Sequence, residues 1–213
     1  MSELVLPTTT PSPSPVVFSS DEPTASAIIL AGVAEFSTRG FHGTSVRDIA
    51  SAAAVSVGTL YNHFGSKHEL LSTIMNRGMD DLLTKTEDAL FHAGADPADH
   101  LRAIVGVHVG VHAHAPRESL IGNSELRSLE PAVLSLIVAK RDAQQRMFYR
   151  VIENGVARGY FTTSTARDTA RFVITACTAV ASWFRLDGQL QVDEIVARYQ
   201  DIALRAVGYR EQD

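Results

Sequence analysis

Apolar residues recur at three- and four-residue intervals along most of the chain after residue 20, which is the helical period. No stretch keeps the strict alternation of a strand long enough to build a sheet, and no internal repeat is found. The pattern therefore predicts an all-α protein of about nine helices. The first twenty residues differ, because prolines at positions 7, 11, 13 and 15 stand among Ser and Thr. We expect residues 1–20 to form a disordered tail.

The first helix is predicted from an apolar face that precedes a glycine. The face consists of Ile29, Leu30, Val33, Phe36 and Ser37. Arg39-Gly40 is expected to end this helix, and Phe41 then follows as a packing residue.

Two short helices should follow, each with a polar N-cap. The second helix begins at Thr44 or Ser45, with Asp48 three residues after Ser45 as a box-like partner. Ser56 is the expected N-cap of a third helix over residues 57–63, which ends near Phe64-Gly65. Two helices joined by a tight turn are thus predicted between residues 44 and 64.

A capping box at residues 66–69 opens a long fourth helix. Prolines at 97, 116 and 131 then predict helices over about 98–114, 117–128 and 131–157. Two further apolar stripes, separated by Asp187-Gly188, are wide enough that we expect them to pair with the same helices of a second chain. The stripes are Phe172, Val173, Ala176, Cys177, Val180 and Phe184, and Ile195, Tyr199, Ile202 and Ala206.

Composition places the chain among ordinary soluble proteins. Hydrophobic residues make up 45% and charged residues 20% of the 213 residues. The single cysteine, Cys177, excludes an intrachain disulfide framework and favours a packing role over a redox role. No apolar run reaches the length of a membrane span, and no secretion signal is present. We expect a cytoplasmic protein without a membrane partner.

The formal net charge of −5 at first argues against binding to DNA, whose phosphates require cations. The distribution changes this picture. Residues 38–77 contain four Lys or Arg against two Asp or Glu, whereas the remaining residues contain 15 against 22. A mildly basic module therefore precedes an acidic body.

The segment TSVRDIASAAAVSVGTLYNHFGSKHELL (44–71) and the preceding ILAGVAEFSTRGF (29–41) resemble the DNA-binding domain of the TetR family of bacterial repressors. That family has a capped helix, a tight turn, a short recognition helix and a Phe-x-x-Lys segment in this order. The resemblance implies a three-helix helix-turn-helix domain over residues 21–66 and a larger helical ligand-binding and dimerisation domain over residues 67–213. It implies a homodimer on palindromic double-stranded operator DNA.

The helix after Ser56 is the expected DNA reader, because short side chains at its start let the backbone approach base edges in the major groove. The flanking residues would contact phosphates, assisted by helix N-termini. The predicted DNA-binding residues are Ser56, Val57, Gly58 and Thr59 at the bases, Tyr61, Asn62 and His63 on the same helix, and Thr44, Ser45, Arg47 and Lys67 as clamps.

Two positions depart from the family pattern. Ala54 stands in the turn where members usually have glycine, so a positive φ there must be strained or avoided. Val57 stands where members often have a basic residue. Both departures predict modest non-specific affinity for DNA.

The C-terminal half resembles the TetR subgroup that regulates fatty-acid, sterol-ring and aromatic-acid breakdown, in segments 123–131, 141–161 and 183–207. In that subgroup the effector is commonly an acyl-coenzyme A thioester, which needs an apolar slot and cations for its phosphates. The predicted ligand-binding residues are Arg127, Arg141, Arg146 and Arg150 with Phe148, Trp183 and Phe184. Alternatively, the arginines are solvated or paired with neighbouring glutamates.

His108 and His112 are spaced i, i+4, which allows two histidines on one helix face to share a metal. No carboxylate or cysteine accompanies them at ligand spacing, so a pocket-lining role is favoured and no metal or cofactor is expected. No catalytic motif is found, which favours a regulator over an enzyme. Two alternatives remain: a multidrug-type sensor repressor, and a helical ligand-binding or interaction module that has lost DNA binding.

Overall fold

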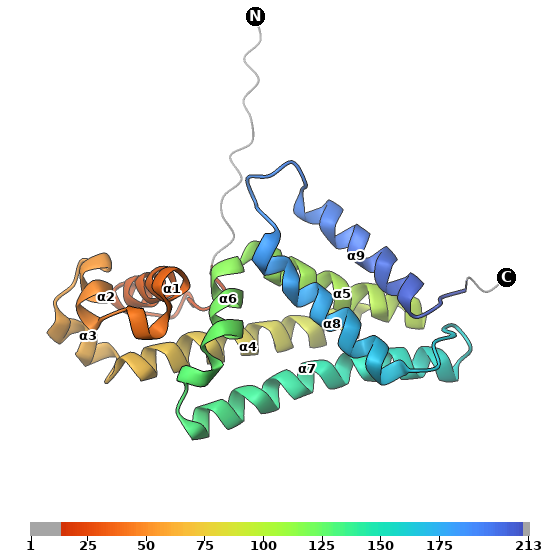
Figure 1. Ribbon diagram of the computed structural model, residues 1–213, viewed down its shortest axis with the longest axis horizontal. Coiled ribbons are helices and arrows are strands. Elements are labelled where there is room, and N and C mark those ends of the chain that lie inside the picture. The colour runs from red at the N-terminus through yellow and green to blue at the C-terminus, as the bar shows by residue number, and fades with distance from the viewer. Residues whose placement is uncertain (1–13, 211–213) are drawn as a thin grey trace, which may run out of the picture.

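The computed structural model describes residues 14–210, and within them it contains nine α-helices, one 3-10 helix and no strand (Figure 1). The prediction of an all-α fold is confirmed. The elements are α1 (Pro23–Gly43), α2 (Val46–Ala52), α3 (Val57–His63), α4 (Lys67–His92), α5 (Pro97–His114), α6 (Pro116–Ser124), η1 (Glu125–Ser128), α7 (Pro131–Ala157), α8 (Ala166–Trp183) and α9 (Val192–Ala206).

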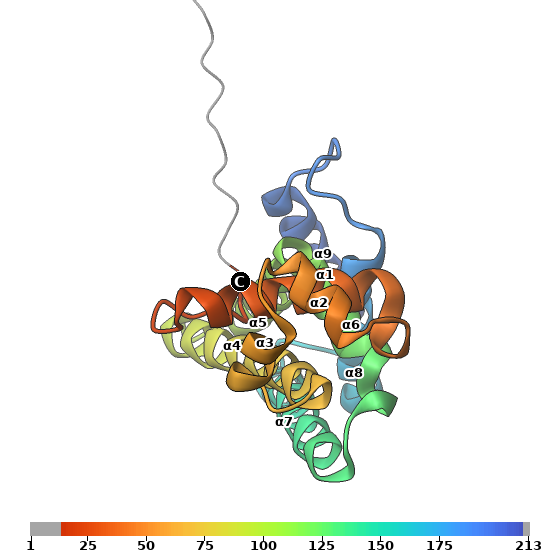
Figure 2. The same cartoon turned by 90° about the vertical axis from the view of Figure 1, so that its left-hand side faces the viewer.

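Helices α1 to α3 gather at one end of the molecule and form what we call the N-terminal module (Figure 1). The remaining helices, α4 to α9, form the C-terminal bundle, and α4 runs from the module along the length of this bundle. Figure 2, viewed from the module's end, shows α1 to α3 in front of the near end of α4. A displacement of α4 would therefore move residues that contact both the N-terminal module and the C-terminal bundle.

Two apolar cores correspond to these parts, but their boundary does not follow the chain. The first core joins the module to the start of α4, and it also takes in Ile121, Leu129 and Ile137 from α6, the following loop and α7. The second core lies among α5, α8, α9 and the second half of α7, around the fully buried Phe148. The module thus packs directly on part of the C-terminal bundle.

The end of α1 follows the sequence prediction. Gly40 interrupts the helix with φ 70° and ψ 167°, a conformation open to glycine because it lacks a Cβ atom. Phe41 turns inward directly after this break and is 2% exposed. Leu30 was expected on the buried face of α1, and this prediction is wrong, because its side chain is 47% exposed.

The caps of α2 and α4 are built as expected, with one difference. Ser45 and Asp48 form a reciprocal capping box at the start of α2. At α4, the Ser66 side chain accepts from the Glu69 backbone N–H, but the Glu69 carboxylate accepts from the N–H of Gly65 instead of that of Ser66. The Glu69 side chain therefore caps the backbone one residue before the N-cap.

The turn between α2 and α3 is strained rather than rearranged. Ala54 has φ 55° and is the one non-glycine residue with positive φ among residues 14–210. Its Cβ atom is crowded in this left-handed conformation, at a cost of about 1–2 kcal/mol.

Residues 14–20 differ from the predicted disordered tail, whose first thirteen residues lie outside the described part of the chain. Val16 is fully buried in the core of the N-terminal module. Arg77 on α4 donates to the Val16 carbonyl at 3.1 Å and forms a two-pronged ion pair with Asp21. Composition did not reveal this ordering, because it depends on contacts with distant α4.

The proline-based boundaries in the C-terminal bundle agree with the structure, except that α6 ends at Ser124 and the chain continues as η1.

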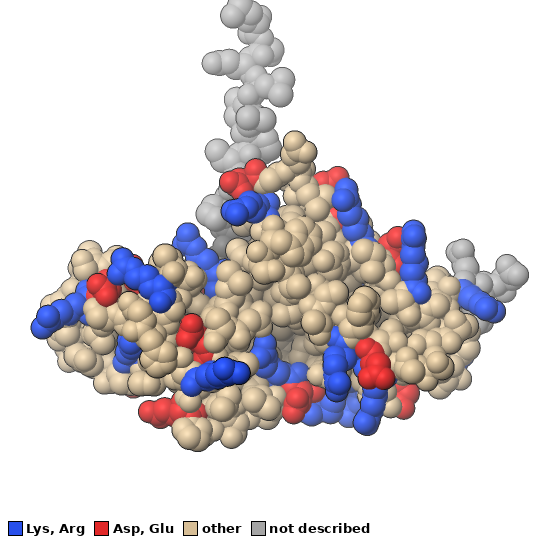
Figure 3. Space-filling view, viewed as in Figure 1, with Lys and Arg blue, Asp and Glu red and all other residues tan. Residues whose placement is uncertain are grey.

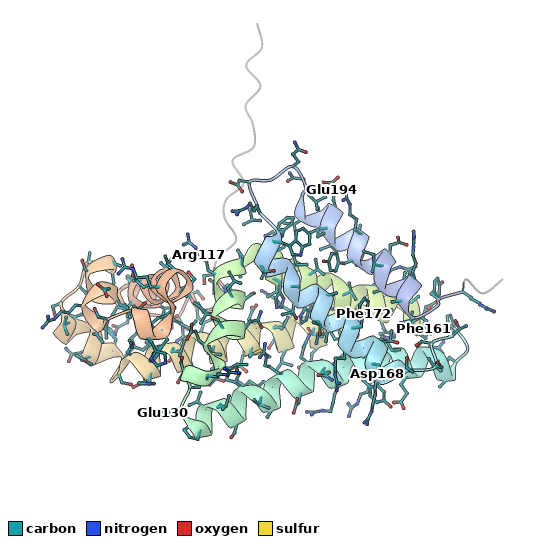
Figure 4. All side chains as sticks on the ribbon, viewed as in Figure 1. Arg117, Glu130, Phe161, Asp168, Phe172 and Glu194 are labelled. Carbon is teal, nitrogen blue, oxygen red and sulfur yellow. The ribbon has the colours of Figure 1, made fainter. Side chains whose placement is uncertain are left out.

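The ring of Phe161 packs closely against Gly155 on α7. A side chain at position 155 would not fit, since a Cβ atom there would lie 2.1 Å from that ring. Figure 4 shows Asp168 and Glu194 near the first turns of α8 and α9, where carboxylates stabilise a helix through its dipole. Within residues 14–210, no helix combines the length and apolarity needed to cross a membrane.

Candidate nucleic-acid interface and ligand cavity

Helix α3 presents a polar face to solvent because its apolar residues turn inward. Leu60 is fully buried, and Phe64 directly after the helix is 7% exposed. Ser56 caps the helix by accepting from the Thr59 N–H at 3.0 Å. On the opposite side Tyr61 is 47% exposed. The other predicted contacts on α3 are exposed or half-buried: Ser56, Gly58 and Asn62 are exposed, and Val57, Thr59 and His63 are half-buried.

Ser45 and Arg47 are exposed at the start of α2. The described residues provide Arg47 with no ion-pair partner, so its guanidinium is available to an external anion. Arg39, in contrast, lies 3.4 Å from Glu35 and 3.7 Å from Asp48. Figure 3 shows blue cationic side chains over the end of the molecule formed by the N-terminal module.

The prediction that the Thr44 side chain clamps a phosphate is wrong. Thr44 is 2% exposed, and its hydroxyl donates to the carbonyl oxygen of Gly40 at 2.8 Å. The β-branched side chain thus closes the end of α1 and does not face solvent.

Lys67 also serves the module itself. Its Nζ donates to the carbonyl oxygens of Phe41 at 2.8 Å and Thr44 at 2.7 Å, and it lies 4.1 Å from the centre of the Phe41 ring. Burial lowers the pKa of the Lys67 ammonium. Two of its three N–H groups are committed to the end of α1, so the predicted role as a free phosphate clamp is corrected to that of a tie between α1 and α4.

A partly open cavity of about 110 Å³ lies between α4, α5, α6, α7 and α8, and Pro15 from the segment before α1 also lines it. Its apolar wall consists of Ile74, Met75, Met79, Leu82, Val111, Ile137 and Ile174. A polar group of side chains lines the same space: His108, His112, Glu118, Ser119, Asn123, Arg141, Gln144 and Thr178. This combination of apolar walls and a few convergent polar groups is typical of small-molecule sites.

The two histidines of the cavity stack on each other, with ring centres 4.4 Å apart. His108 Nε2 is 2.9 Å from the Thr178 hydroxyl, which itself donates to the Ile174 carbonyl. The His108 ring nitrogen Nε2 therefore donates, and Nδ1 is left to accept from the Gln144 amide at 3.4 Å. His112 Nδ1 lies 2.7 Å from the His108 carbonyl oxygen, so this nitrogen carries a proton.

Burial lowers the pKa of His108 well below its usual range, and the nearby His112 and Arg141 add to this shift. Burial lowers the pKa of His112 as well, although its hydrogen bond to the His108 carbonyl partly opposes the shift and Arg141 adds to it. Both rings are thus neutral near pH 7. No cluster of three or more metal-binding side chains is found in the described residues.

Arg141 is the cation of this cavity. Its guanidinium donates to the neutral side-chain oxygen of Asn123 at 2.6 Å, and the described residues supply no carboxylate partner. Burial lowers the pKa of Arg141. A half-buried cation without a counter-ion makes the cavity attractive to an anionic or carbonyl oxygen.

Of the seven predicted ligand-binding residues, Arg141 lines this cavity. Phe148 is fully buried behind it, with its ring edge-on to His108 at 5.5 Å. Phe184 lies in the second core, and Trp183 is 49% exposed. Arg127, Arg146 and Arg150 are exposed on η1 and α7 and do not line the cavity.

Sequence reasoning found His108 and His112 through their spacing but did not find Gln144 or Thr178. These two residues lie on α7 and α8, far from the histidines in sequence. Cys177 packs in the second core as expected, and burial raises the pKa of its thiol to about 12.

A second, more open cavity of about 590 Å³ adjoins the first. Pro15, Val111, Ala115 and Glu118 line both cavities and so form the wall between them. Carboxylates dominate the charge of the outer cavity, with Asp81, Asp88 and Glu118 against Lys85. The Ser14 hydroxyl donates to Glu118 at 2.5 Å and holds the ordered segment against this wall.

Comparison with known proteins covers both parts of the chain. Residues 28–74 match the family model described as bacterial regulatory proteins of the tetR family. Residues 94–207, more than half of the chain, match the model of the tetracyclin repressor-like C-terminal domain.

The chain is similar to the HTH-type transcriptional repressor KstR2 of Mycobacterium tuberculosis, with 28% identity over 176 residues that cover 82% of this chain and 88% of the relative. A tetR-family regulatory protein from Rhodococcus RHA1 has a similar structure, with a TM-score of 0.83, 29% identity and coverage of 90% of this chain and 100% of that one. AibR, solved in complex with isovaleryl coenzyme A and operator DNA, shares the fold with a TM-score of 0.77 at 22% identity, covering 88% of this chain and 100% of that one.

Proposed function

The chain belongs to the TetR family of transcriptional regulators, and we propose that it represses transcription by binding a palindromic operator as a dimer until a small-molecule effector occupies its cavity. The observation that carries this proposal is the pairing of an exposed, capped α3 with a partly open cavity that α4 links to it. The proposal involves no enzymatic step and places the protein with its operator in the cytoplasm.

The exposed residues of α3 would enter the major groove. Tyr61 and the neighbouring Asn62 are exposed and would reach phosphates or base edges, and Ser45 and Arg47 would contact the adjoining backbone. Val57 and Thr59 are half-buried but lie at the start of the helix, where the backbone approaches the bases. We propose that these residues, together with Ser56, Gly58 and His63, form the DNA-reading face.

The C-terminal bundle leaves large apolar side chains uncovered on α8, on α9 and in the loop between them. Phe172 is 60%, Trp183 49%, Leu186 55% and Ile202 50% exposed. Figure 4 shows Phe172 on α8, pointing away from the core. Because exposed apolar patches mark interaction sites, we propose that α8 and α9 pair with those of a second copy. Such a dimer would set two α3 helices about 34 to 36 Å apart, one DNA turn.

The cavity supports an effector with an apolar body and an oxygen that binds Arg141. An acyl thioester fits these requirements, and isovaleryl coenzyme A is the ligand of the similar AibR structure. An effector that binds one dimer geometry more tightly than another would shift the population and release DNA. Helix α4, which lines the cavity and contacts α1, is the proposed lever. Arg127, Arg146 and Arg150 remain candidates for external phosphates.

Selection from random double-stranded DNA tests the proposal, with the purified full-length protein as bait. We expect an inverted repeat to be enriched and a panel of acyl thioesters to release it. A protein that enriches no sequence would not be an operator-binding regulator, and the chain would then be a ligand-binding module without DNA binding.

A multidrug-type sensor is the second candidate, favoured by the outer cavity. Its apolar lining, with Leu30 and Val107, and its excess of carboxylates would suit an organic cation. Melting-temperature shifts separate the two sensors by mass action: acyl thioesters stabilise an acyl sensor, whereas lipophilic cations stabilise a multidrug sensor.

A further inference from the structure

Polar side chains of the cavity in the C-terminal bundle have fixed hydrogen-bonding directions, and these directions define what a ligand must offer. Gln144 is 2% exposed, and its amide nitrogen lies 3.0 Å from the Thr86 hydroxyl as well as 3.4 Å from His108 Nδ1. The Thr86 hydroxyl already donates to the Leu82 carbonyl, so its oxygen accepts from Gln144. The His108 ring is therefore held in one tautomer by partners on α7 and α8.

His112 is held equally firmly, but by one nitrogen alone. Nδ1 donates to the His108 carbonyl at 2.7 Å, and the ring stacks on His108 with an interplanar angle of 14°. Within residues 14–210 no hydrogen bond reaches Nε2, and this nitrogen is not among the fully enclosed polar atoms. Because the ring is neutral, Nε2 carries a lone pair and can act as an acceptor on a residue that lines the cavity.

Arg141 supplies the complementary group. It lines the same cavity from α7, and its guanidinium has N–H groups left after the bond to Asn123. Its charge acts on both histidine rings. The cavity thus offers an acceptor at His112 Nε2 and a cationic donor at Arg141, whose remaining N–H groups have no partner within the described residues. The buried Oε1 of Gln144 is a second acceptor without a partner, and the Glu118 carboxylate lines the same space.

The size of the cavity limits the body that carries these groups. Its volume of about 110 Å³ is close to the roughly 150 Å³ of an engineered apolar cavity that binds benzene. The space between these helices therefore holds one ring or a short branched chain. A larger effector must continue past the wall at Pro15 or toward the exposed Asn123.

We propose that the effector is a hydroxylated carboxylic acid or its thioester with a body of single-ring size, whose hydroxyl donates to His112 Nε2 while its carboxyl or carbonyl oxygen accepts from Arg141. This inference rests on the proposed ligand-responsive function and makes His112 the residue that determines specificity. A keto analogue lacks the donor, leaves Nε2 unpaired and places two acceptors against each other. Sites built around a hydrogen bond discriminate strongly against such analogues.

The test uses cyclohexanecarboxylate, its 2-, 3- and 4-hydroxy derivatives and the matching oxo derivatives, each as the free acid and as the coenzyme A thioester. Affinities for the full-length protein are measured by calorimetry. We expect one hydroxy isomer to bind at least about tenfold more tightly than its oxo and unsubstituted counterparts. The better of the acid and thioester forms shows whether the carboxyl group is free or esterified in the natural effector.

Three variants show which residue causes the preference for the hydroxy ligand. His112→Phe keeps an aromatic ring on His108 and should remove the preference for hydroxyl over oxo, because Nε2 is lost. Arg141→Met should weaken all three ligand classes together. His92→Phe, at the exposed end of α4, is the matched control and should change neither value.

Equal binding of hydroxy and oxo ligands by the wild-type protein would overturn the inference, and so would a preference that survives in His112→Phe. Binding of none of the probes would overturn it as well. Operator binding, measured in the same samples without ligand, decides the proposed function separately. If His112→Phe does not fold, the wild-type preference alone remains decisive.

Discussion

The N-terminal module carries its polar candidate residues on the surface, whereas the C-terminal bundle carries them in a cavity between helices. In the module, the polar residues of α3 lie outside a small core, and one continuous segment supplies all of them. In the bundle, the cavity lies between helices and takes most of its lining from five of them, with residues between 74 and 178. A face made from one segment can change its sequence without disturbing the fold, whereas a cavity made from five helices responds to any of them.

The largest effect should come from truncating Phe148, which is fully buried behind the cavity. Phe148→Ala removes a ring from the second core and leaves a void, which typically costs about 3 to 5 kcal/mol of unfolding free energy. Urea denaturation measures this loss. Tyr61→Ala serves as the control at an exposed position, with a change within about 0.5 kcal/mol. Comparable losses of unfolding free energy in the two variants would contradict the contrast between a buried cavity wall and an exposed face.

Tyr61→Ala should act on DNA binding instead. Loss of a phosphate or base-edge contact should weaken operator affinity by about 1 to 3 kcal/mol, while circular dichroism shows an unchanged helix content. Fluorescence anisotropy with a labelled operator measures the affinity. An unchanged dissociation constant would mean that Tyr61 is not in the interface.

Acid should weaken the bundle through its buried histidines. The pKa values of His108 and His112 are lowered in the folded protein, whereas unfolded histidines titrate near about 6.5. The unfolded state therefore binds more protons below that pH, and stability falls as the pH drops from about 6.5 toward the folded pKa values. His112→Phe should flatten this dependence in melting curves from pH 8 to 5. An equally steep dependence of stability on pH in His112→Phe would mean that groups other than His112 cause it.

The smallest effect concerns the turn before α3. Ala54→Gly removes the strain at φ 55° but adds backbone freedom to the unfolded chain, so we expect a net stabilisation of about 0.5 to 1 kcal/mol. Thermal unfolding measures this gain. Ala52→Gly, at the last residue of α2, is the matched control with helical φ and ψ and should destabilise. Destabilisation by Ala54→Gly would show that the positive φ costs little.

The sequence predicted the module better than the bundle, because the module is built from local signals. Each of these signals, the caps at Ser45, Ser56 and Ser66 and the break at Gly40, acts on the backbone within a few residues of itself. The errors in the module concern the direction of side chains. Leu30 faces solvent, whereas Thr44 and Lys67 turn toward the end of α1.

In the bundle, periodicity and prolines located the helices but not the cavity. Of the predicted ligand-binding arginines, Arg141 lines the cavity, whereas Arg127, Arg146 and Arg150 are exposed, since helix spacing alone does not say which face meets a distant helix. The burial of Val16 and the bond between Gln144 and His108 join residues that are far apart in sequence. Such pairings follow from the tertiary packing.

The salt dependence of operator affinity tests the central claim, that the exposed face of α3 and its flanks read DNA, most directly. For the wild-type protein we expect the logarithm of the association constant to fall linearly with the logarithm of salt concentration, with a slope set by the number of phosphate contacts. Arg47→Ala should reduce that slope by about one unit. Affinity that is insensitive to salt, or a slope unchanged in Arg47→Ala, would contradict the account.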